Sequence, residues 1–290
     1  MKETTDEEFF QHATKVIVLA DTHTGAYESP KPQTFLREDE KAKKLPVGCN
    51  DMQFYANTKW NEMIVRHSDA DIVLLLGDLV EGTDDKSKGH ACWSTNIDDQ
   101  IRANVALLSF FKRAEFVGVQ GSKYHTAMNP SWDQKVLESL AKNGFKTHFS
   151  KEDYGFYIED VGFHLRHNIG YRKDKKHRGN PLGEELLAFE LHEKDIGDYR
   201  VILRGHTHYY VYMGNADRYA CIVPGWKGRD AFASHRTVDV PDCGYLVFYV
   251  LDDQYKHGGD IWKYPKEYLM NTGSYRKSKK INAYSSARIR

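Results

Sequence analysis

Acidic and imidazole side chains recur directly after apolar runs in this sequence. The clusters are Asp21 and His23 after residues 15–20, Asp78 after 71–76, His125 shortly after 115–120, His167 at the end of 163–167, and His206 and His208 after 199–203. A buried carboxylate is costly unless it is compensated, and metal coordination is one of the few ways to compensate it. Mixed aspartate and histidine ligands suit Mn²⁺, Zn²⁺, Fe²⁺ or Ni²⁺ better than Mg²⁺ or Ca²⁺, which prefer oxygen. The clusters therefore predict a centre for divalent metal ions.

These side chains require strands that end near one another. The apolar runs 15–20, 71–76, 115–120 and 199–203 predict buried strands. Apolar spacing and capping residues predict helices at 97–111, 131–143 and 181–193. Alternation of strands and helices predicts an α/β fold, and such folds bind ligands beyond the carboxyl ends of their strands.

The second half of the sequence is rich in predicted strands. Hairpins are expected from the pairs 154–158 with 163–167 and 209–213 with 218–223, because each pair flanks a turn containing glycine. Residues 244–251 predict a last long strand. We expect these strands to form a second sheet packed against the first.

Composition excludes several classes of protein. The chain has 290 residues with 41 Lys and Arg against 41 Asp and Glu, which disfavours a protein that coats nucleic acid non-specifically. No apolar run approaches the roughly 20 residues of a membrane span, and the acidic start is unlike a signal peptide. The four cysteines form no C-x-x-C pair, so neither a disulfide framework nor a structural zinc site is expected. The composition predicts a soluble cytoplasmic protein.

Three motifs carry a resemblance to a known family. Asp21-x-His23, Gly77-Asp78-x-x-x-Gly82 and Gly205-His206-x-His208, in this order, resemble the calcineurin-like metallophosphoesterase superfamily. More loosely, a helix with Gln53 and Trp60 before the second strand resembles phage-encoded members, as do Gly121-Ser122-Lys123-Tyr124-His125 and Val223-Pro224-Gly225-Trp226. The resemblance implies a two-sheet β-sandwich flanked by helices in four layers, α/β/β/α. It also implies one domain over 1–270 with an insertion at about 24–60, followed by a basic tail, 271–290, which is predicted to be mobile.

The resemblance further implies a binuclear metal centre. One ion would be held by Asp21, His23, Asp78 and His208, and the other by Asp78, His167 and His206. His125 would lie beside the scissile group and protonate the leaving alkoxide. The family's third motif is Gly-Asn-His-Asp/Glu, whereas here Ser122 follows Gly121 and the histidine is displaced to His125. Ser122, Asn168 or water would replace the missing asparagine ligand.

The implied activity is hydrolysis of a phosphoester. Two divalent ions, with Mn²⁺ favoured, would supply a bridging hydroxide that attacks phosphorus. Basic residues around 172–178 and in the tail favour a phosphodiesterase or nuclease acting on a nucleotide or nucleic acid, with Arg166 and Arg172 as candidate substrate contacts. Alternatives are a phosphomonoesterase acting on a protein or small metabolite, and a catalytically weak scaffold that uses the metal cleft as a binding surface. An alternative interpretation is that the basic residues around 172–178 and in the tail are simply exposed to solvent and bind no ligand. His164, expected on the opposite face of its strand from His167, is predicted to be structural.

Overall fold

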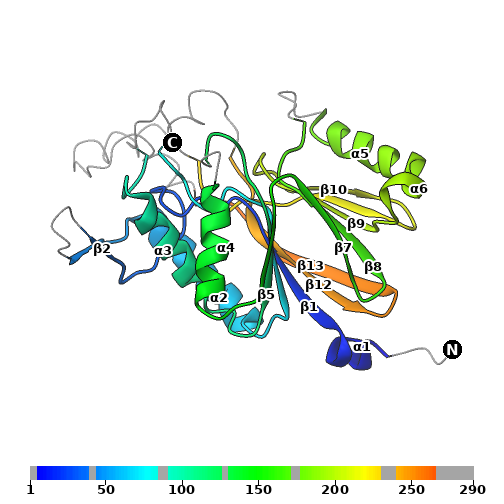
Figure 1. The fold of residues 1–290 in the computed structure, drawn as a ribbon, viewed down its shortest axis with the longest axis horizontal. Coiled ribbons are helices and arrows are strands. Elements are labelled where there is room, and N and C mark those ends of the chain that lie inside the picture. The colour runs from blue at the N-terminus through cyan, green and yellow to red at the C-terminus, as the bar shows by residue number, and fades with distance from the viewer. Residues whose placement is uncertain are drawn as a thin grey trace, which may run out of the picture.

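Two β-sheets pack face to face, and helices cover the outer face of each (Figure 1). The computed structural model describes residues 5–38, 44–83, 91–125, 130–170, 177–229 and 240–265. One hydrophobic cluster lies between the two sheets. A second lies between the first sheet and its helices, and a third lies between the second sheet and its helices. The predicted fold class, a two-sheet sandwich flanked by helices in four layers, is therefore confirmed.

The first sheet has the strand order β13-β12-β1-β4-β5-β6. Its strands are β1 (Thr14–Leu19), β4 (Ile72–Leu75), β5 (Glu115–Val119), β6 (Thr147–Ser150), β12 (Cys243–Leu251) and β13 (Gln254–Trp262). Strands β1, β4, β5 and β6 run parallel to one another, whereas β12 runs antiparallel to β1. The carboxyl ends of the parallel strands therefore lie at one edge of the sheet.

Four helices accompany this sheet: α1 (Asp6–His12), α2 (Asp51–His67), α3 (Ile97–Leu108) and α4 (Trp132–Lys142). Helix α4 begins after Ser131, whose side chain accepts a hydrogen bond from the backbone of Gln134. It ends before Gly144, which has a positive φ of 93°. The helices expected at 97–111 and 131–143 are thus present, the first of them ending at Leu108, as is the helix that carries Gln53 and Trp60.

The second sheet has the order β10-β11-β9-β8-β7. It consists of β7 (Asp153–Ile158), β8 (Val161–Arg166), β9 (Val201–Arg204), β10 (Val211–Gly214) and β11 (Tyr219–Ile222). Helix α5 (Asn180–Leu191), which covers it, is followed by the short α6 (Glu193–Ile196). Both expected hairpins are present, because β7 pairs antiparallel with β8 and β10 pairs antiparallel with β11.

The prediction for the end of the chain was wrong in two respects. Strand β12 joins the first sheet beside β1 instead of the second sheet, and it is not the last strand because β13 follows it. Strand β12 fits an interior position because its two faces are both buried: Phe248 packs between the sheets, while Tyr245 packs on the side of the helices. The glycines Gly258 and Gly259 weaken the strand pattern of β13 in the sequence.

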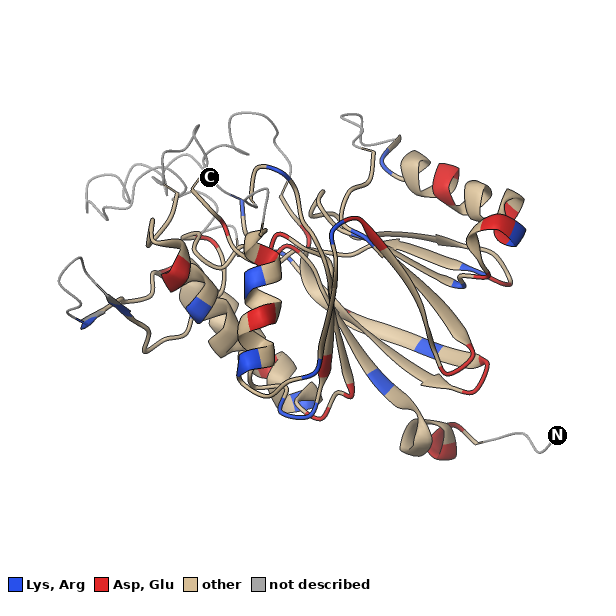
Figure 2. Cartoon of the chain, viewed as in Figure 1, with Lys and Arg blue, Asp and Glu red and all other residues tan. Residues whose placement is uncertain are grey.

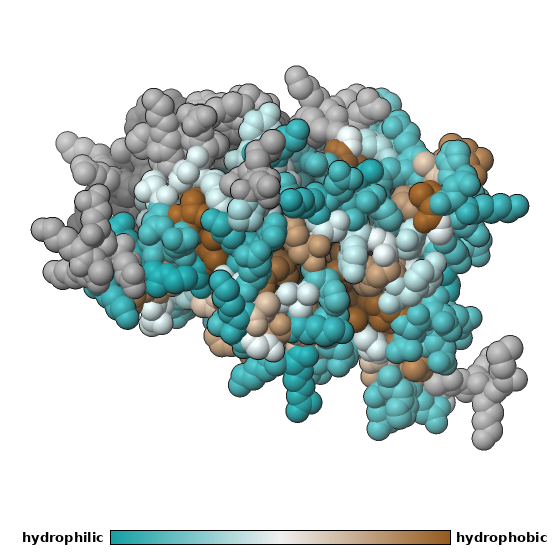
Figure 3. All heavy atoms as spheres, in the orientation of Figure 1, coloured by the Kyte–Doolittle hydropathy of each residue, from teal (hydrophilic) through white to brown (hydrophobic). Residues whose placement is uncertain are grey.

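Polar and apolar residues separate as this layering requires. Charged residues lie mainly on helices and in loops, and the strands are mostly uncharged (Figure 2). On the face drawn in Figure 3, hydrophilic residues cover much of the surface, with hydrophobic residues visible in separate areas. Among the described residues, no helix is both long enough and apolar enough to cross a bilayer. The four cysteines are free thiols, three of them buried.

Within the predicted insertion, β2 (Leu36–Glu38) and β3 (Lys44–Pro46) form a small antiparallel pair. The division of the chain into a domain over 1–270 with an insertion stays a prediction. The predicted tail, 271–290, lies outside the described residues.

A buried carboxylate joins the loops that follow β4 and β5. Asp133, in the first turn of α4, accepts hydrogen bonds from the backbone N–H groups of Leu79 at 2.9 Å and Gly121 at 2.8 Å. The two loops approach so closely at Gly77 that a Cβ there would lie 2.5 Å from the Cα of Gly121. Asp133 thus fixes the relative position of the loops that carry Asp78 and Ser122.

We predict that Asp133→Asn destabilises the protein by about 1–3 kcal/mol, because the amide NH₂ must face one of the two backbone N–H groups and leaves that donor unpaired. Denaturant unfolding at pH 8 measures the change. The control is Asp98→Asn, which removes an exposed acid from the first turn of α3 and should change stability by less than about 0.5 kcal/mol. Equal effects of the two substitutions would contradict a role for the Asp133 hydrogen bonds.

Candidate metal centre

The predicted ligands converge in space. Asp21 and His23 lie just beyond β1, Asp78 beyond β4, His167 beyond β8, and His206 and His208 beyond β9. Three groups have ligand atoms within 4.8 Å of one another: Asp21 with His23 and His208, Asp78 with His167 and His206, and His23 with Asp78 and His125. The structure therefore brings two carboxylates and five imidazoles, from both sheets, into one cluster.

The backbone at five of these residues is in the left-handed region. The φ angles are 51° at Asp21, 43° at His23, 49° at Asp78, 75° at His206 and 53° at His208. Such conformations are uncommon for residues other than glycine and cost of order 1–3 kcal/mol each. Hydrogen bonds between loops hold them in place: Asp21 N donates to Gly77 O at 3.1 Å and His23 N donates to Asp78 O at 2.9 Å. The strained turns direct the side chains forward from the strand ends.

Each carboxylate uses one oxygen to hold a neighbouring loop. Asp21 Oδ2 accepts from the backbone N–H of His206 at 3.0 Å, and Asp78 Oδ1 accepts from that of Ser122 at 2.7 Å. The other oxygen of each faces imidazoles, with Asp21 Oδ1 at 3.2 Å from His208 Nε2 and Asp78 Oδ2 at 3.2 Å from His167 Nε2. One oxygen of each aspartate is thus fixed to the scaffold, and the other faces the cluster.

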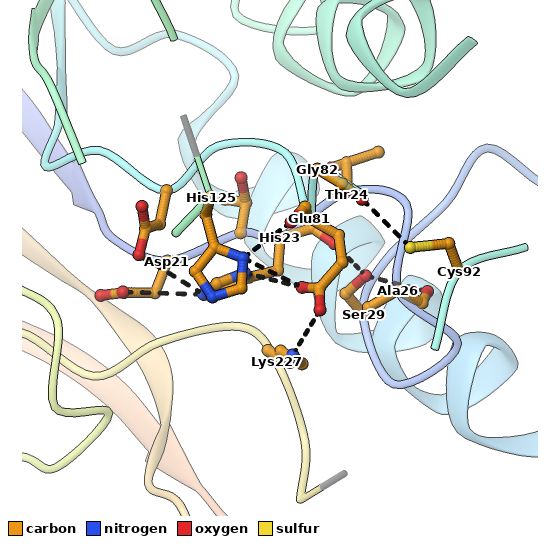
Figure 4. Close-up of polar contacts among 12 residues, drawn as sticks. Asp21, His23, Thr24, Ala26, Ser29, Glu81, Gly82, Cys92, His125 and Lys227 are labelled. Atoms are coloured by element: carbon orange, nitrogen blue, oxygen red, sulfur yellow. Dashed lines mark hydrogen bonds and ion pairs between the residues drawn. The ribbon is translucent and has the colours of Figure 1, made fainter. Parts of the chain in front are cut away.

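Two of the imidazoles are hydrogen-bonded through Nδ1, and a third has its Nδ1 against a carboxylate. His167 Nδ1 hydrogen-bonds to Leu76 O at 2.5 Å, and His125 Nδ1 to Glu81 O at 2.7 Å. His23 Nδ1 lies 2.8 Å from Glu81 Oε2 (Figure 4). Metal-binding histidines commonly have one nitrogen held in this way while the other binds the ion. In all three, Nε2 is the nitrogen left for a ligand role.

Ser122, at the place of the missing asparagine, lies against Asp78. Its hydroxyl is 3.2 Å from Asp78 Oδ1 and 3.0 Å from Oδ2. The side chain of Ser122 thus contacts a predicted ligand, and its own ligand role stays a prediction.

Of the two candidate substrate contacts, Arg166 and Arg172, the structure describes only Arg166. Arg166 pairs with Glu185 of α5, and its Nε donates to Asn168 O at 3.2 Å. Arg172 lies outside the described residues. His164 is directed away from the cluster, toward α5, where its ring contacts Phe189.

Three further buried residues lie around the cluster, and of these the sequence suggested only Lys227, as a residue that could line the cleft. Glu81 occupies an unspecified position of the Gly77–Gly82 motif, Asp133 lies on α4, and Lys227 follows the packed Trp226. Lys227 Nζ donates to Glu81 Oε1 at 2.8 Å. For Glu81, the available signal was an acidic residue shortly after Asp78, since metal-binding histidines commonly have carboxylate partners.

The electrostatics of the cluster fit divalent cations. Burial alone would lower the pKa of His23 and of His167, but Asp21 and Glu81 raise that of His23 to about 9, and Asp78 raises that of His167 to about 10. Despite burial, His208 chiefly holds the pKa of Asp21 below its usual range, and His167 chiefly does the same for Asp78. Among the described residues, the buried atoms Asp21 Oδ1, His23 Nε2 and His167 Nε2 make no hydrogen bond. These unsatisfied atoms are oxygen and nitrogen donors of the type that Mn²⁺, Zn²⁺ and Fe²⁺ accept.

No family model matches this chain, and no curated protein matches it. Solved structures similar to it include wild-type Vps29 of Entamoeba histolytica in complex with Zn²⁺, with 12% identity over 87% of this chain and 99% of that chain and a TM-score of 0.41. A novel archaeal phosphodiesterase has 13% identity over 85% and 99% of the two chains and a TM-score of 0.43. The phosphoesterase YfcE of E. coli has 12% identity over 84% and 98%, with a TM-score of 0.40. Identities and TM-scores this low leave the function to be argued from this chain's own side chains, and the looser resemblance to phage-encoded members stays a prediction.

We predict that the metal-free protein loses stability as the pH rises from 6.5 to about 10. A histidine whose pKa is raised by folding stabilises the folded state fully below its unfolded pKa, and this contribution is lost as the pH passes through the folded value. Thermal unfolding in EDTA across this range measures the effect. Added Zn²⁺ or Mn²⁺ should remove most of the dependence, because the cation replaces the protons.

Two variants test the assignment of this pH dependence. His167→Asn should flatten the curve, whereas His164→Asn should not, because burial lowers the pKa of His164 to about 4 and keeps that ring neutral throughout the range. A wild-type curve that is flat between pH 6.5 and 10 would contradict the charge state described for the cluster.

Proposed function

We propose that this protein is a phosphoester hydrolase that depends on two divalent metal ions and belongs with the calcineurin-like metallophosphoesterases. The observation that carries the proposal is the convergence of Asp21, His23, Asp78, His167, His206 and His208 from both sheets into one cluster with unsatisfied ligand atoms. Asp21, His23 and His208 would hold one ion, Asp78, His167 and His206 would hold the other, and Asp78 would contact both. Mn²⁺ is the favoured ion, and Zn²⁺, Fe²⁺ and Ni²⁺ suit the same donors.

Bound cations would neutralise phosphoryl oxygens and lower the pKa of water to near neutrality. The remaining roles belong to the chain. Asp21 and Asp78, each held by a backbone N–H, fix the positions of the ligands before substrate binds. His125, whose Nδ1 is held by Glu81 O, would present Nε2 to the leaving oxygen and donate a proton there.

The pairing of basic residues with carboxylates around and next to the ligands favours a phosphodiester over a phosphomonoester. Lys227 is paired with Glu81, and Arg166, which precedes His167, is paired with Glu185. Both are therefore compensated by carboxylates, which suits a diester with one negative charge better than a monoester with two. A nucleotide or nucleic-acid phosphodiester is the proposed substrate class, and Arg172 remains a candidate contact to it.

We predict that the Mn²⁺-loaded protein releases p-nitrophenol from bis(p-nitrophenyl) phosphate faster than from p-nitrophenyl phosphate. EDTA should abolish the activity and Mn²⁺ should restore it. Asp78→Asn, which removes the carboxylate between the two ligand groups, should lower kcat/KM at least ~100-fold, while Asp98→Asn on the surface should leave it unchanged.

The same assay distinguishes the alternatives. Faster hydrolysis of the monoester would indicate a phosphomonoesterase. Near-zero turnover of both esters, with and without Mn²⁺, would indicate a binding scaffold, an alternative that draws on the replacement of the family's asparagine by Ser122.

His125→Ala should slow esters with poor leaving groups about 10²–10⁴-fold, the usual contribution of a general acid, and should slow nitrophenyl esters much less. Burial lowers the pKa of His125, so its contribution should be largest below the ordinary imidazole pKa of about 6.5. Comparing kcat/KM for alkyl and nitrophenyl diesters over pH 5–8 measures this. Equal losses on both classes would remove the acid role.

A further inference from the structure

Glu81 contacts two imidazoles of the cluster through different groups. The residue is buried, at 6% exposure, and Oε2 lies 2.8 Å from His23 Nδ1. Its main-chain oxygen accepts a hydrogen bond from His125 Nδ1 at 2.7 Å. Figure 4 shows Glu81 beside both rings, with Lys227 below its carboxylate group. Glu81 therefore contacts both His23, a proposed metal ligand, and His125, the proposed general acid.

The contact with Glu81 determines which nitrogen of His23 can bind a cation. An ionised carboxylate oxygen 2.8 Å from a ring nitrogen attracts a proton there and repels a lone pair, so this ion pair favours the form of His23 with a proton on Nδ1, although the contact falls outside hydrogen-bond geometry. Once the second ring proton is lost, the lone pair of Nε2 lies 3.8 Å from Asp21 Oδ1 and 4.0 Å from Asp78 Oδ2. These separations are too long for hydrogen bonds and suit atoms that share a cation.

Lys227 determines the charge and orientation of Glu81. Without a counter-ion, Glu81 would be a third buried carboxylate near Asp21 and Asp78, which is unfavourable. Lys227 is itself buried, at 6% exposure, and bonds to Oε1, which leaves Oε2 for His23. The preceding Trp226 is fully buried between Trp60 and Trp262, so the backbone at Lys227 is anchored in the core.

We propose that Glu81 and Lys227 form a positioning pair, in which Lys227 fixes the Glu81 carboxylate and that carboxylate keeps His23 in the tautomer that binds a divalent cation through Nε2. This inference rests on the proposed metal-dependent function. The side chain of Glu81 acts on His23, whereas the main-chain oxygen acts on His125, so substitution of the side chain affects metal binding and leaves the orientation of His125 in place.

A pair of variants tests which polar group of residue 81 must face His23 Nδ1. In Glu81→Gln, Lys227 attracts the amide oxygen and the amide NH₂ therefore faces His23 Nδ1. The ring proton then moves to Nε2 and competes with the cation. We expect Mn²⁺ and Zn²⁺ affinity, measured by calorimetry on EDTA-stripped protein, to fall about 10–100-fold. In the double variant Glu81→Gln with Lys227→Met, the amide oxygen is free to face His23, and most of the lost affinity should return.

Two further measurements separate positioning from a structural effect. Nitrogen-15 spectra of the Zn²⁺-loaded protein should show His23 bound through Nε2 with a protonated Nδ1, and should show the loss of this signature in Glu81→Gln. Glu185→Gln is the matched control, because it removes a carboxylate that pairs with Arg166 and Arg204 away from His23. It should leave metal affinity unchanged even where it lowers the unfolding temperature.

The outcomes are distinguishable. Wild-type protein that binds neither Mn²⁺ nor Zn²⁺ would overturn the proposed function together with the positioning pair. Metal-binding wild-type protein with unchanged affinity in Glu81→Gln, or a double variant no better than the single one, would overturn the pair alone. Lys227→Met alone keeps the Glu81 carboxylate but removes the group that fixes it, so metal affinity should fall, by less than in Glu81→Gln. Affinity equal to that of the wild type would overturn the positioning role of Lys227.

Discussion

The burial of two ionised carboxylates beside five imidazoles is the interaction on which the rest of this structure depends. Asp21 and Asp78 are each almost completely buried, and each has one oxygen fixed by a backbone N–H from a distant loop. The free energy of such an arrangement is favourable only when all the loops are in place, since an unpaired charge in the interior is costly. The left-handed backbone at both aspartates adds strain that the surrounding hydrogen bonds must offset. The fold therefore has to be precise at the ends of its strands.

Much of this could be predicted from local sequence. Apolar runs in the sequence predict the buried strands. The capping residue Ser131 predicts the start of helix α4, and Gly144 predicts its end. Because parallel strands end at a common edge, the clusters after them predicted a common site. The sequence pattern of a strand, however, does not show which other strand it pairs with. Strand β12 is apolar enough for an interior position in either sheet, and only packing against β1 decides which.

The residues around the ligands were harder to predict, because their contacts are tertiary. Asp133 lies on a helix, where an acidic residue in the first turn is ordinary, and only the folded chain brings its oxygens to the N–H groups of Leu79 and Gly121. Lys227 follows Trp226, and nothing in the local sequence indicates that it pairs with Glu81, 146 residues away along the chain. Local spacing identifies side chains that could bind a cation, while the groups that orient them come from elements far away along the chain.

The cluster is assembled from both sheets. Asp21, His23 and Asp78 follow strands of the first, whereas His167, His206 and His208 follow strands of the second. The separation of the sheets is set by side chains such as Phe163 and Phe248, whose rings meet edge to face at 5.6 Å. A smaller side chain at either position would allow the two sheets to move closer together. His167, His206 and His208 would then shift together relative to Asp21 and Asp78. The geometry of the centre is thus governed in part by apolar residues that never touch it.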